Sequence, residues 1–162
     1  LNDAEDLWLW RNESITRESS INKEKIEFSR HLSWLENTLR DQNIMIFLGI
    51  EKKTKNKIGV VRFSKKQKIA EASITINPNF RGLGFSQVLL EKAVAAFFLT
   101  NPNIGLKARV FESNTASFKI FTRVGFKYRK LQQNGIMNLH LSCKSFNGLK
   151  IFSEKRKLHN DG

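Results

Sequence analysis

Apolar residues recur along the chain with two different periods. In residues 3–13 and 26–40 they recur at helical spacing, which predicts two amphipathic helices. The polar segment between them, residues 14–22, is predicted to be a loop. Three segments then show the spacing of strands and are joined by lysine-rich turns. These predicted strands cover residues 44–51, 57–64 and 68–76.

The second half of the chain continues with the same two periods. Residues 83–99 form a long apolar helical pattern that ends at an Asn-Pro-Asn sequence. A second helix is predicted over residues 115–124, where Asn114 could cap its start and Gly125 could close its end. Strands are predicted over residues 104–111, 126–131 and 136–143. Strands and helices in this order predict a mixed α/β (α+β) fold.

The junction between the third strand and the long helix, NPNFRGLGFS at residues 77–86, has the chemistry of a phosphate site. Gly82 and Gly84 permit positive φ and a close backbone approach, and the helix that follows offers unpaired N–H groups at its positive end. Arg81 could add a charge to the same anion. A pyrophosphate is therefore the expected ligand, although the pattern also fits a plain strand-to-helix connection.

A second segment, NTASFKIFTRVGF at residues 114–126, follows the predicted strand 104–111. Together the two segments resemble the GCN5-related N-acetyltransferase (GNAT) family over about residues 3–141. The resemblance implies a twisted, mostly antiparallel mixed sheet of six to seven strands with about four flanking helices. It also implies acetyl-CoA as cosubstrate and no metal.

The resemblance assigns the acetyl-CoA contacts to three places. These are the strand before the loop, where its pairing with the next parallel strand opens, the loop itself, and the helix after Asn114. The residues are Ile74, Thr75, Ile76, Arg81, Gly82, Leu83, Gly84, Phe85, Ser86, Asn114, Ser117 and Phe121. Ser86 stands where the family usually has Gly or Ala. Phe121 stands where many relatives have a Tyr that reprotonates the CoA thiolate, so water or another residue would serve; Tyr128 is the only tyrosine.

Two residues are candidate general bases. Glu71 lies between Ala70 and Ala72 on a strand expected at the centre of the sheet, where burial would raise the pKa of its carboxyl. It could equally be an exposed cross-strand partner of Lys57 or Arg62. His31, on the second predicted helix, is the other candidate and could also be a structural residue.

The order Trp10-Arg11-Asn12, then His31 and Trp34, resembles the acceptor side of a GNAT branch that acetylates nucleotide-linked amino sugars, as in the pseudaminic acid pathway. It is also similar to ribosomal-protein N-terminal acetyltransferases. Either resemblance implies that Arg11, Asn12 and Trp34 contact the acceptor, with Arg11 on a phosphate or carboxylate and Trp34 stacked on a sugar or base. From the residues alone, a surface position for Arg11 and core packing for Trp34 remain open.

The chain carries a net charge of +13 that is unevenly distributed. Residues 1–41 hold nine acids and six bases, a net of −3, so the remaining residues carry +16. Such a field attracts polyanions such as CoA and nucleotide-linked sugars. RNA binding would also need exposed aromatics among the lysines, and the basic run 52–68 contains only Phe63, so nucleic acid is not an expected partner.

The length of 162 residues suits one domain, predicted over residues 1–143 and followed by a basic tail, 144–162. The strand that usually opens the GNAT fold could precede Leu1. Cys143, the only cysteine, excludes an internal disulfide and is expected to be buried in the last strand. The longest apolar run, residues 93–99, is far shorter than the roughly 20 residues of a membrane span. With no visible signal peptide, a cytoplasmic location is expected, and a homodimer is left open.

We therefore expect an acetyl-CoA-dependent N-acetyltransferase acting on a small-molecule amine, a nucleotide-linked amino sugar for preference. One alternative keeps the enzyme and changes the acceptor to a protein N-terminus. The other is a non-catalytic acyl-CoA-binding module, which Phe121 in place of Tyr would favour.

Overall fold

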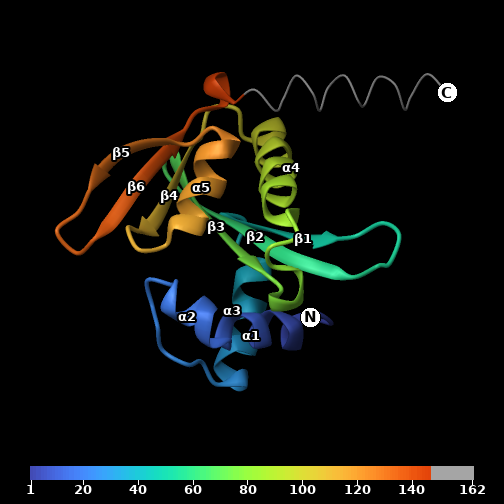
Figure 1. Ribbon diagram of the computed structural model, residues 1–162. Coiled ribbons are helices and arrows are strands. Elements are labelled where there is room, and N and C mark those ends of the chain that lie inside the picture. Colours follow the sequence, from blue (N-terminus) through green and yellow to red (C-terminus); the bar gives the residue numbers. More distant parts are fainter. Residues whose placement is uncertain (147–162) are drawn as a thin grey trace, which may run out of the picture.

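The computed structural model describes residues 1–146, which form one six-stranded sheet flanked by helices (Figure 1). The strand order is β1-β2-β3-β4-β6-β5. Neighbouring strands are antiparallel except β3 and β4, which are parallel. This confirms the predicted mixed, mostly antiparallel sheet. The strands are β1 (Ile44–Ile50), β2 (Lys57–Lys66), β3 (Ile69–Ile76), β4 (Gly105–Phe111), β5 (Lys127–Leu131) and β6 (Ile136–Leu141).

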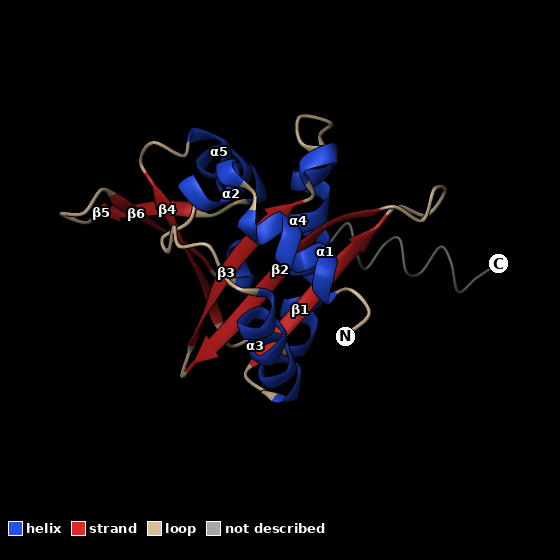
Figure 2. Ribbon diagram, turned by 90° about the horizontal axis from the view of Figure 1, so that it is seen from below, coloured by secondary structure: helices blue, strands red, loops and turns tan. Residues whose placement is uncertain are grey.

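Two layers of helices cover the two faces of the sheet. The helices are α1 (Ala4–Asn12), α2 (Ser14–Glu18), α3 (Phe28–Arg40), α4 (Phe85–Thr100) and α5 (Thr115–Val124). Helices α4 and α5 pack on one face, while α1 and α3 lie below the sheet in Figure 1 and on its near side in Figure 2. No helix within residues 1–146 has the length and apolar character needed to cross a membrane.

The alternation of side chains along β2 separates the two faces chemically. Val61 and Phe63 are fully buried in the large core under α4 and α5. Val60 packs instead with the small cluster of α1 and α3 that contains Leu35. Because successive strand residues point to opposite faces, Arg62 shares the face of Val60. A charged side chain is thus directed towards the α1–α3 layer.

The parallel strands β3 and β4 separate halfway along their length. Their ladder consists of three pairs and ends at Glu71 with Lys107. Beyond that pair the two strands diverge towards their carboxyl ends, as Figure 1 shows. The backbone of β3 after Glu71 therefore has no β4 partner, which confirms the predicted opening.

Both ends of α5 are capped as the sequence predicted. The Asn114 side chain accepts a hydrogen bond of 3.0 Å from the Ser117 backbone N–H. Gly125 ends the helix in the left-handed region, with φ of 108°. These local signals fix where α5 begins relative to the separated strands.

The prediction of a loop over residues 14–22 was wrong in part, because residues 14–18 form α2. Glu13 caps this helix by accepting a hydrogen bond of 2.9 Å from the Thr16 backbone N–H. Its carboxylate also forms an ion pair with Arg81, which is distant from it in the sequence. A helix of five residues has little stability of its own, so this long-range contact explains why it forms.

The end of the described chain also differs from expectation. Strand β6 ends at Leu141, and the partly buried Cys143 starts a short 3₁₀ turn rather than ending the strand. Phe146 is buried against Phe98, with ring centroids 5.8 Å apart. The packed core thus extends past the predicted boundary at residue 143. The rest of the predicted tail, 147–162, lies outside the described residues.

Candidate functional site

The loop before α4 has the backbone geometry of an anion site. Gly82 and Gly84 adopt φ of 76° and 80°, and a Cβ built on either would meet nothing within 4 Å. Gly84 is the N-cap of α4 and provides no side-chain cap, so the first N–H groups of the helix remain available. Leu83 is exposed, and Phe85 packs edge-on against Phe80. The loop fits a pyrophosphate at a helix N-terminus.

Arg81 lies beside this loop, but its guanidinium is already engaged. Its Nη2 lies 2.7 Å from Glu13 Oε2 and donates to Thr16 Oγ1 at 2.6 Å. The hydrogen bond from Arg81 is the main cause that lowers the pKa of Glu13 to about 2. Arg81 therefore has to share or exchange its carboxylate partner in order to contact a phosphate.

Two adjoining cavities connect the loop with the opening between β3 and β4. The smaller, of about 270 Å³, is lined by the loop, including Gly82 and Ser86, and by the end of β3, including Ile76. The larger, of about 470 Å³, extends under α1 and α3. Residues that line both cavities join them; these are Ser19, Ser20, Ile74, Thr75, Asn114 and Ser117. A long ligand could therefore run from the phosphate loop into the larger cavity.

Phe121 closes one side of the larger cavity. It is buried, packs edge-on against Phe126 with ring centroids 5.0 Å apart, and has no hydroxyl to offer. Tyr128, the only tyrosine, is 49% exposed on β5 and lines neither cavity. The structure therefore does not support Tyr128 as the residue that reprotonates a thiolate.

The prediction of a raised pKa for Glu71 was wrong. Its Oε1 accepts a hydrogen bond of 2.9 Å from Arg109 Nε and forms an ion pair with Arg109 Nη2 at 2.7 Å, and its Oε2 lies 3.3 Å from Lys107 Nζ. Burial raises the pKa of this carboxyl, but the bonds and charges of Arg109 and Lys107 outweigh burial and lower it. The partners lie on β4 and are not the predicted Lys57 or Arg62.

His31 is buried on α3 and lines the larger cavity. Its Nε2 has no hydrogen-bond partner among residues 1–146, and its ring lies 5.3 Å from that of Trp34. Burial lowers the pKa of His31; a backbone hydrogen bond at Ala4 opposes this, and the charge of Arg11 lowers the pKa further. The imidazole is thus neutral near pH 7 and has a nitrogen free to accept a proton.

The predicted acceptor contacts divide into two groups. Arg11 and Trp34 line the larger cavity. Arg11 donates from Nη2 to the Asn22 carbonyl at 2.7 Å, while its Nη1 is buried without a partner in the described chain. Asn12 is not among the residues that line either cavity: its side-chain amide donates to the Ile26 carbonyl at 2.7 Å and accepts from the Ile26 N–H at 2.8 Å. It anchors the segment before α3.

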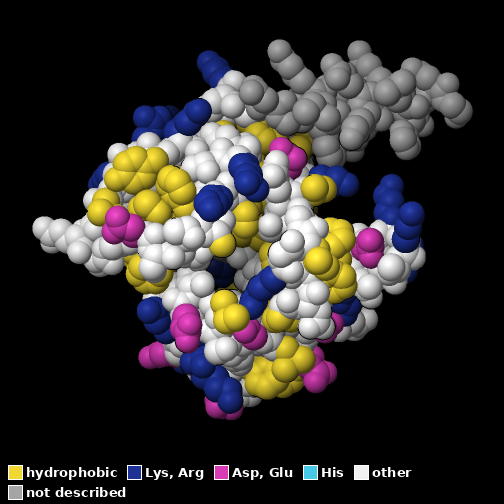
Figure 3. Space-filling model, viewed as in Figure 1, with side chains coloured by type: hydrophobic (Ala, Val, Ile, Leu, Met, Phe, Trp, Pro, Cys, Tyr) yellow, Lys and Arg dark blue, Asp and Glu magenta, His cyan; other side chains and the backbone are white. Residues whose placement is uncertain are grey.

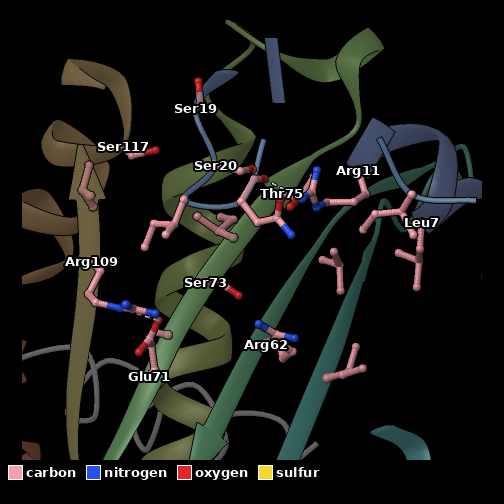
Figure 4. A pocket seen from close by; sticks show the side chains of 18 of the residues that line it. Leu7, Arg11, Ser19, Ser20, Arg62, Glu71, Ser73, Thr75, Arg109 and Ser117 are labelled. Carbon is pink, nitrogen blue, oxygen red and sulfur yellow. Dashed lines mark hydrogen bonds and ion pairs between the residues drawn. The ribbon is translucent and has the colours of Figure 1, made fainter. Parts of the chain in front are cut away.

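Three further arginines line the larger cavity and were not among the predicted site residues. They come from α3, β2 and β4, and are Arg30, Arg62 and Arg109. Figure 4 shows Arg11, Arg62 and Arg109 on different elements around the cavity, with Glu71 held by Arg109. Figure 3 shows a hollow near the centre of this face, with basic side chains beside it. Among the described residues, Glu71 is the one acid in the cavity wall.

The described residues contain no group of three or more His, Cys, Asp or Glu side chains that could hold a metal ion.

Comparisons with known proteins identify the fold. A family model of the acetyltransferase (GNAT) domain matches residues 1–127. Spermidine N-acetyltransferase from Vibrio cholerae, solved with CoA and spermine, superposes with a TM-score of 0.79 at 17% identity, covering 89% of this chain and 92% of that one. Campylobacter jejuni N-acetyltransferase PseH, solved with acetyl-CoA, superposes with a TM-score of 0.68 at 23% identity, covering 87% of this chain and 90% of that one.

A domain from Methanocaldococcus jannaschii gives a TM-score of 0.73 at 24% identity, covering 86% of this chain and 92% of that one. A search of curated proteins finds no significant match. At these identities the solved structures support the fold, while the family model covers well over half of the sequence. The chain therefore belongs to the GNAT family of acetyltransferases, which transfer the acetyl group of acetyl-CoA to an amine.

Proposed function

We propose that this acetyltransferase acts on a small-molecule amine that also carries negative charge, with nucleotide-linked amino sugars as the acceptor class. The observation that carries the proposal is the charge of the larger cavity. Within residues 1–146, four arginines line it, and the one carboxylate in its wall, that of Glu71, is already paired with Arg109 and Lys107. Such a wall attracts phosphates and repels a polycation such as a polyamine.

The arrangement of the two cavities supports a defined position for acetyl-CoA. Its pyrophosphate would lie on the loop around Gly82 and Gly84, at the N-terminus of α4. Its pantetheine arm would pass Asn114 and enter the opening between β3 and β4. The thioester would then lie near Ile74 and Thr75, where the two cavities meet. Unpaired backbone N–H groups of β3 are candidates for stabilising the oxyanion.

We assign the proton-accepting role to His31. Acetyl transfer requires a neutral amine, and a base with a pKa near the working pH removes its proton most effectively. His31 is neutral and lines the larger cavity, and its Nε2 has no hydrogen-bond partner within residues 1–146. Glu71 is less suited because both of its oxygens are occupied by cations. Because Phe121 has no hydroxyl, we propose that water returns a proton to the CoA thiolate.

The location of the enzyme follows from its chemistry and is part of the proposal. The chain has a single cysteine, which suits a reducing compartment, and its cosubstrate is a thioester. We propose the cytoplasm.

The experiment is release of free CoA thiol from acetyl-CoA in the presence of different acceptors. The panel contains UDP-linked amino sugars, short peptides with free N-termini, and spermidine. We expect turnover with an UDP-linked amino sugar and little with the other two classes. Turnover confined to peptides or to spermidine would overturn the assigned acceptor class while leaving the acetyltransferase itself intact.

A further inference from the structure

The acceptor cavity contains a cation without a counter-ion. Arg62 extends from β2 to the face covered by α1 and α3 and lines the cavity. Among residues 1–146, no carboxylate forms an ion pair with it. By contrast, Arg109 is held by Glu71, and Arg30 is exposed to solvent. Arg62 is therefore a partly buried guanidinium of this wall that forms no ion pair within the described residues.

Partial burial of a guanidinium that no carboxylate neutralises costs free energy, and a bound anion would offset that cost. Burial lowers the pKa of Arg62, and the charge of Glu71 compensates only in part. Both carboxylate oxygens of Glu71 are already engaged by Arg109 and Lys107. An anion that enters the cavity would supply the missing charge.

Arg11 provides a second guanidinium to the cavity, from another element of the fold. It comes from α1, and its Nη1 is buried without a hydrogen-bond partner in the described chain. Two guanidinium groups with free N–H groups on one cavity match the geometry and charge of a phosphate group better than those of an amine. The guanidinium N–H groups of Arg11 and Arg62 thus both indicate a phosphate ligand.

Trp34 adds an aromatic surface to these two cations. Trp34 is 39% exposed and lines the cavity, and the centroid of its ring lies 5.5 Å from the guanidinium carbon of Arg62. A cation next to an exposed ring suits a ligand with a phosphate and a flat base, because one contact binds charge while the other stacks. A nucleoside diphosphate has both parts.

We propose that Arg62 and Arg11 form a phosphate subsite of the acceptor cavity, with Trp34 as the stacking surface for the attached base. The subsite determines acceptor specificity and is distinct from the loop at Gly82 and Gly84 that receives the pyrophosphate of CoA. The identity of the acceptor rests on the proposed function, whereas the phosphate chemistry rests on these three side chains.

The test is calorimetric titration of uridine diphosphate into the protein with its cofactor site saturated by CoA. Arg62→Gln should weaken uridine diphosphate binding at least about tenfold, since charge-assisted hydrogen bonds are lost. Arg62→Lys should weaken it less, because the charge remains without the planar fork. Acetyl-CoA affinity should be unchanged in both variants. Arg123→Gln, an exposed arginine on α5, is the matched control.

Equal binding of uridine diphosphate by wild type and Arg62→Gln would overturn the subsite, as would absence of binding to wild type. A loss of acetyl-CoA affinity in Arg62→Gln would also overturn it, because Arg62 would then serve the cofactor. If Arg62→Gln fails to fold, judged by its thermal transition, Arg62→Lys decides the question. Arg62-dependent binding without acetylation of any nucleotide-linked amino sugar would support the subsite and refute the proposed function, so the two failures are distinguishable.

Discussion

At the scale of single residues, the choice of general base depends on which titratable side chain in the cavity has no ion-pair or hydrogen-bond partner among the described residues. Glu71 and His31 both line the larger cavity, and both were candidate bases from the sequence. The sequence around Glu71 indicates burial but does not reveal that Arg109 and Lys107 approach it from β4. His31 has the opposite environment, with a buried Nε2 that has no hydrogen-bond partner in the part of the chain that the structure describes. This Nε2 is the physical reason to prefer His31 over Glu71 as the general base.

His31→Gln should lower kcat at least about 100-fold, the low end of the contribution of a general base. Glu71→Gln should lower kcat less than about tenfold, because it removes an ion pair rather than the base. Thiol release at saturating acetyl-CoA and acceptor measures both values, and the affinity for acetyl-CoA serves as the control for each variant. A larger loss for Glu71→Gln than for His31→Gln would reverse the assignment.

The pH dependence of the wild type should report His31. Because burial is the main cause that lowers its pKa, kcat/KM should fall on the acid side with an apparent pKa below 6.5. The unfolded chain binds this proton first, so the stability contributed by neutral His31 is also lost as pH falls below 6.5. Glu71→Gln should retain the same acid limb. An acid limb centred above 6.5 would argue against a buried, neutral His31.

At the scale of elements, α2 shows what local sequence cannot predict. Residues 14–22 have no apolar period, so a loop was the reasonable prediction, yet Glu13 and Arg81 meet and order one helical turn. By contrast, α5 and the loop before α4 were predictable, because Asn114, Gly125, Gly82 and Gly84 act through their own backbone geometry. Caps and glycine turns can therefore be predicted from the local sequence, whereas contacts between distant residues become visible only in the folded structure.

Arg81→Ala should weaken acetyl-CoA binding about tenfold, since one charge-assisted contact to pyrophosphate is lost. Glu13→Gln is the matched control, because it breaks the same ion pair and leaves the arginine free for phosphate. Its acetyl-CoA affinity should equal or exceed that of the wild type. Calorimetric titration measures all three proteins, and unchanged affinity in Arg81→Ala would exclude a role on pyrophosphate.

The contact between Glu13 and Arg81 should also make stability depend on pH. The pKa of Glu13 falls to about 2 in the folded protein, chiefly through Arg81, from an ordinary value of 4.5. The stabilisation is therefore fully present above pH 4.5 and is lost as pH falls towards 2. Urea unfolding should show wild type more stable than Glu13→Gln at pH 6, with the difference shrinking at pH 3. A difference independent of pH would mean that the ion pair contributes nothing.

At the scale of the whole molecule, the larger cavity arises from elements that are distant in sequence. The alternation along β2 predicts that Arg62 shares a face with Val60, and an arginine within an apolar strand was a signal that could have been used. Which side chains lie opposite Arg62 depends on strand pairing and on the packing of α1 and α3. For that reason the family, the sheet and the phosphate loop were predictable, while the arginine-lined wall was not.

The uneven charge of the chain agrees with this cavity. The net charge of +13 is concentrated beyond residue 41, and the arginines of β2 and β4 bring part of it to the acceptor side. Attraction of this kind is screened by salt. The affinity for an anionic acceptor should therefore fall with ionic strength.

The most direct test of the account compares one amino sugar in two forms, linked to its nucleotide and free. Both forms carry the same amine, so thiol release from acetyl-CoA isolates the contribution of the nucleotide. We predict that kcat/KM is at least about 100-fold higher for the linked form, as two charge-assisted contacts would give, and that the advantage shrinks at high salt. Equal values for the two forms, or faster turnover of spermidine than of either, would contradict an acceptor cavity built for an anion.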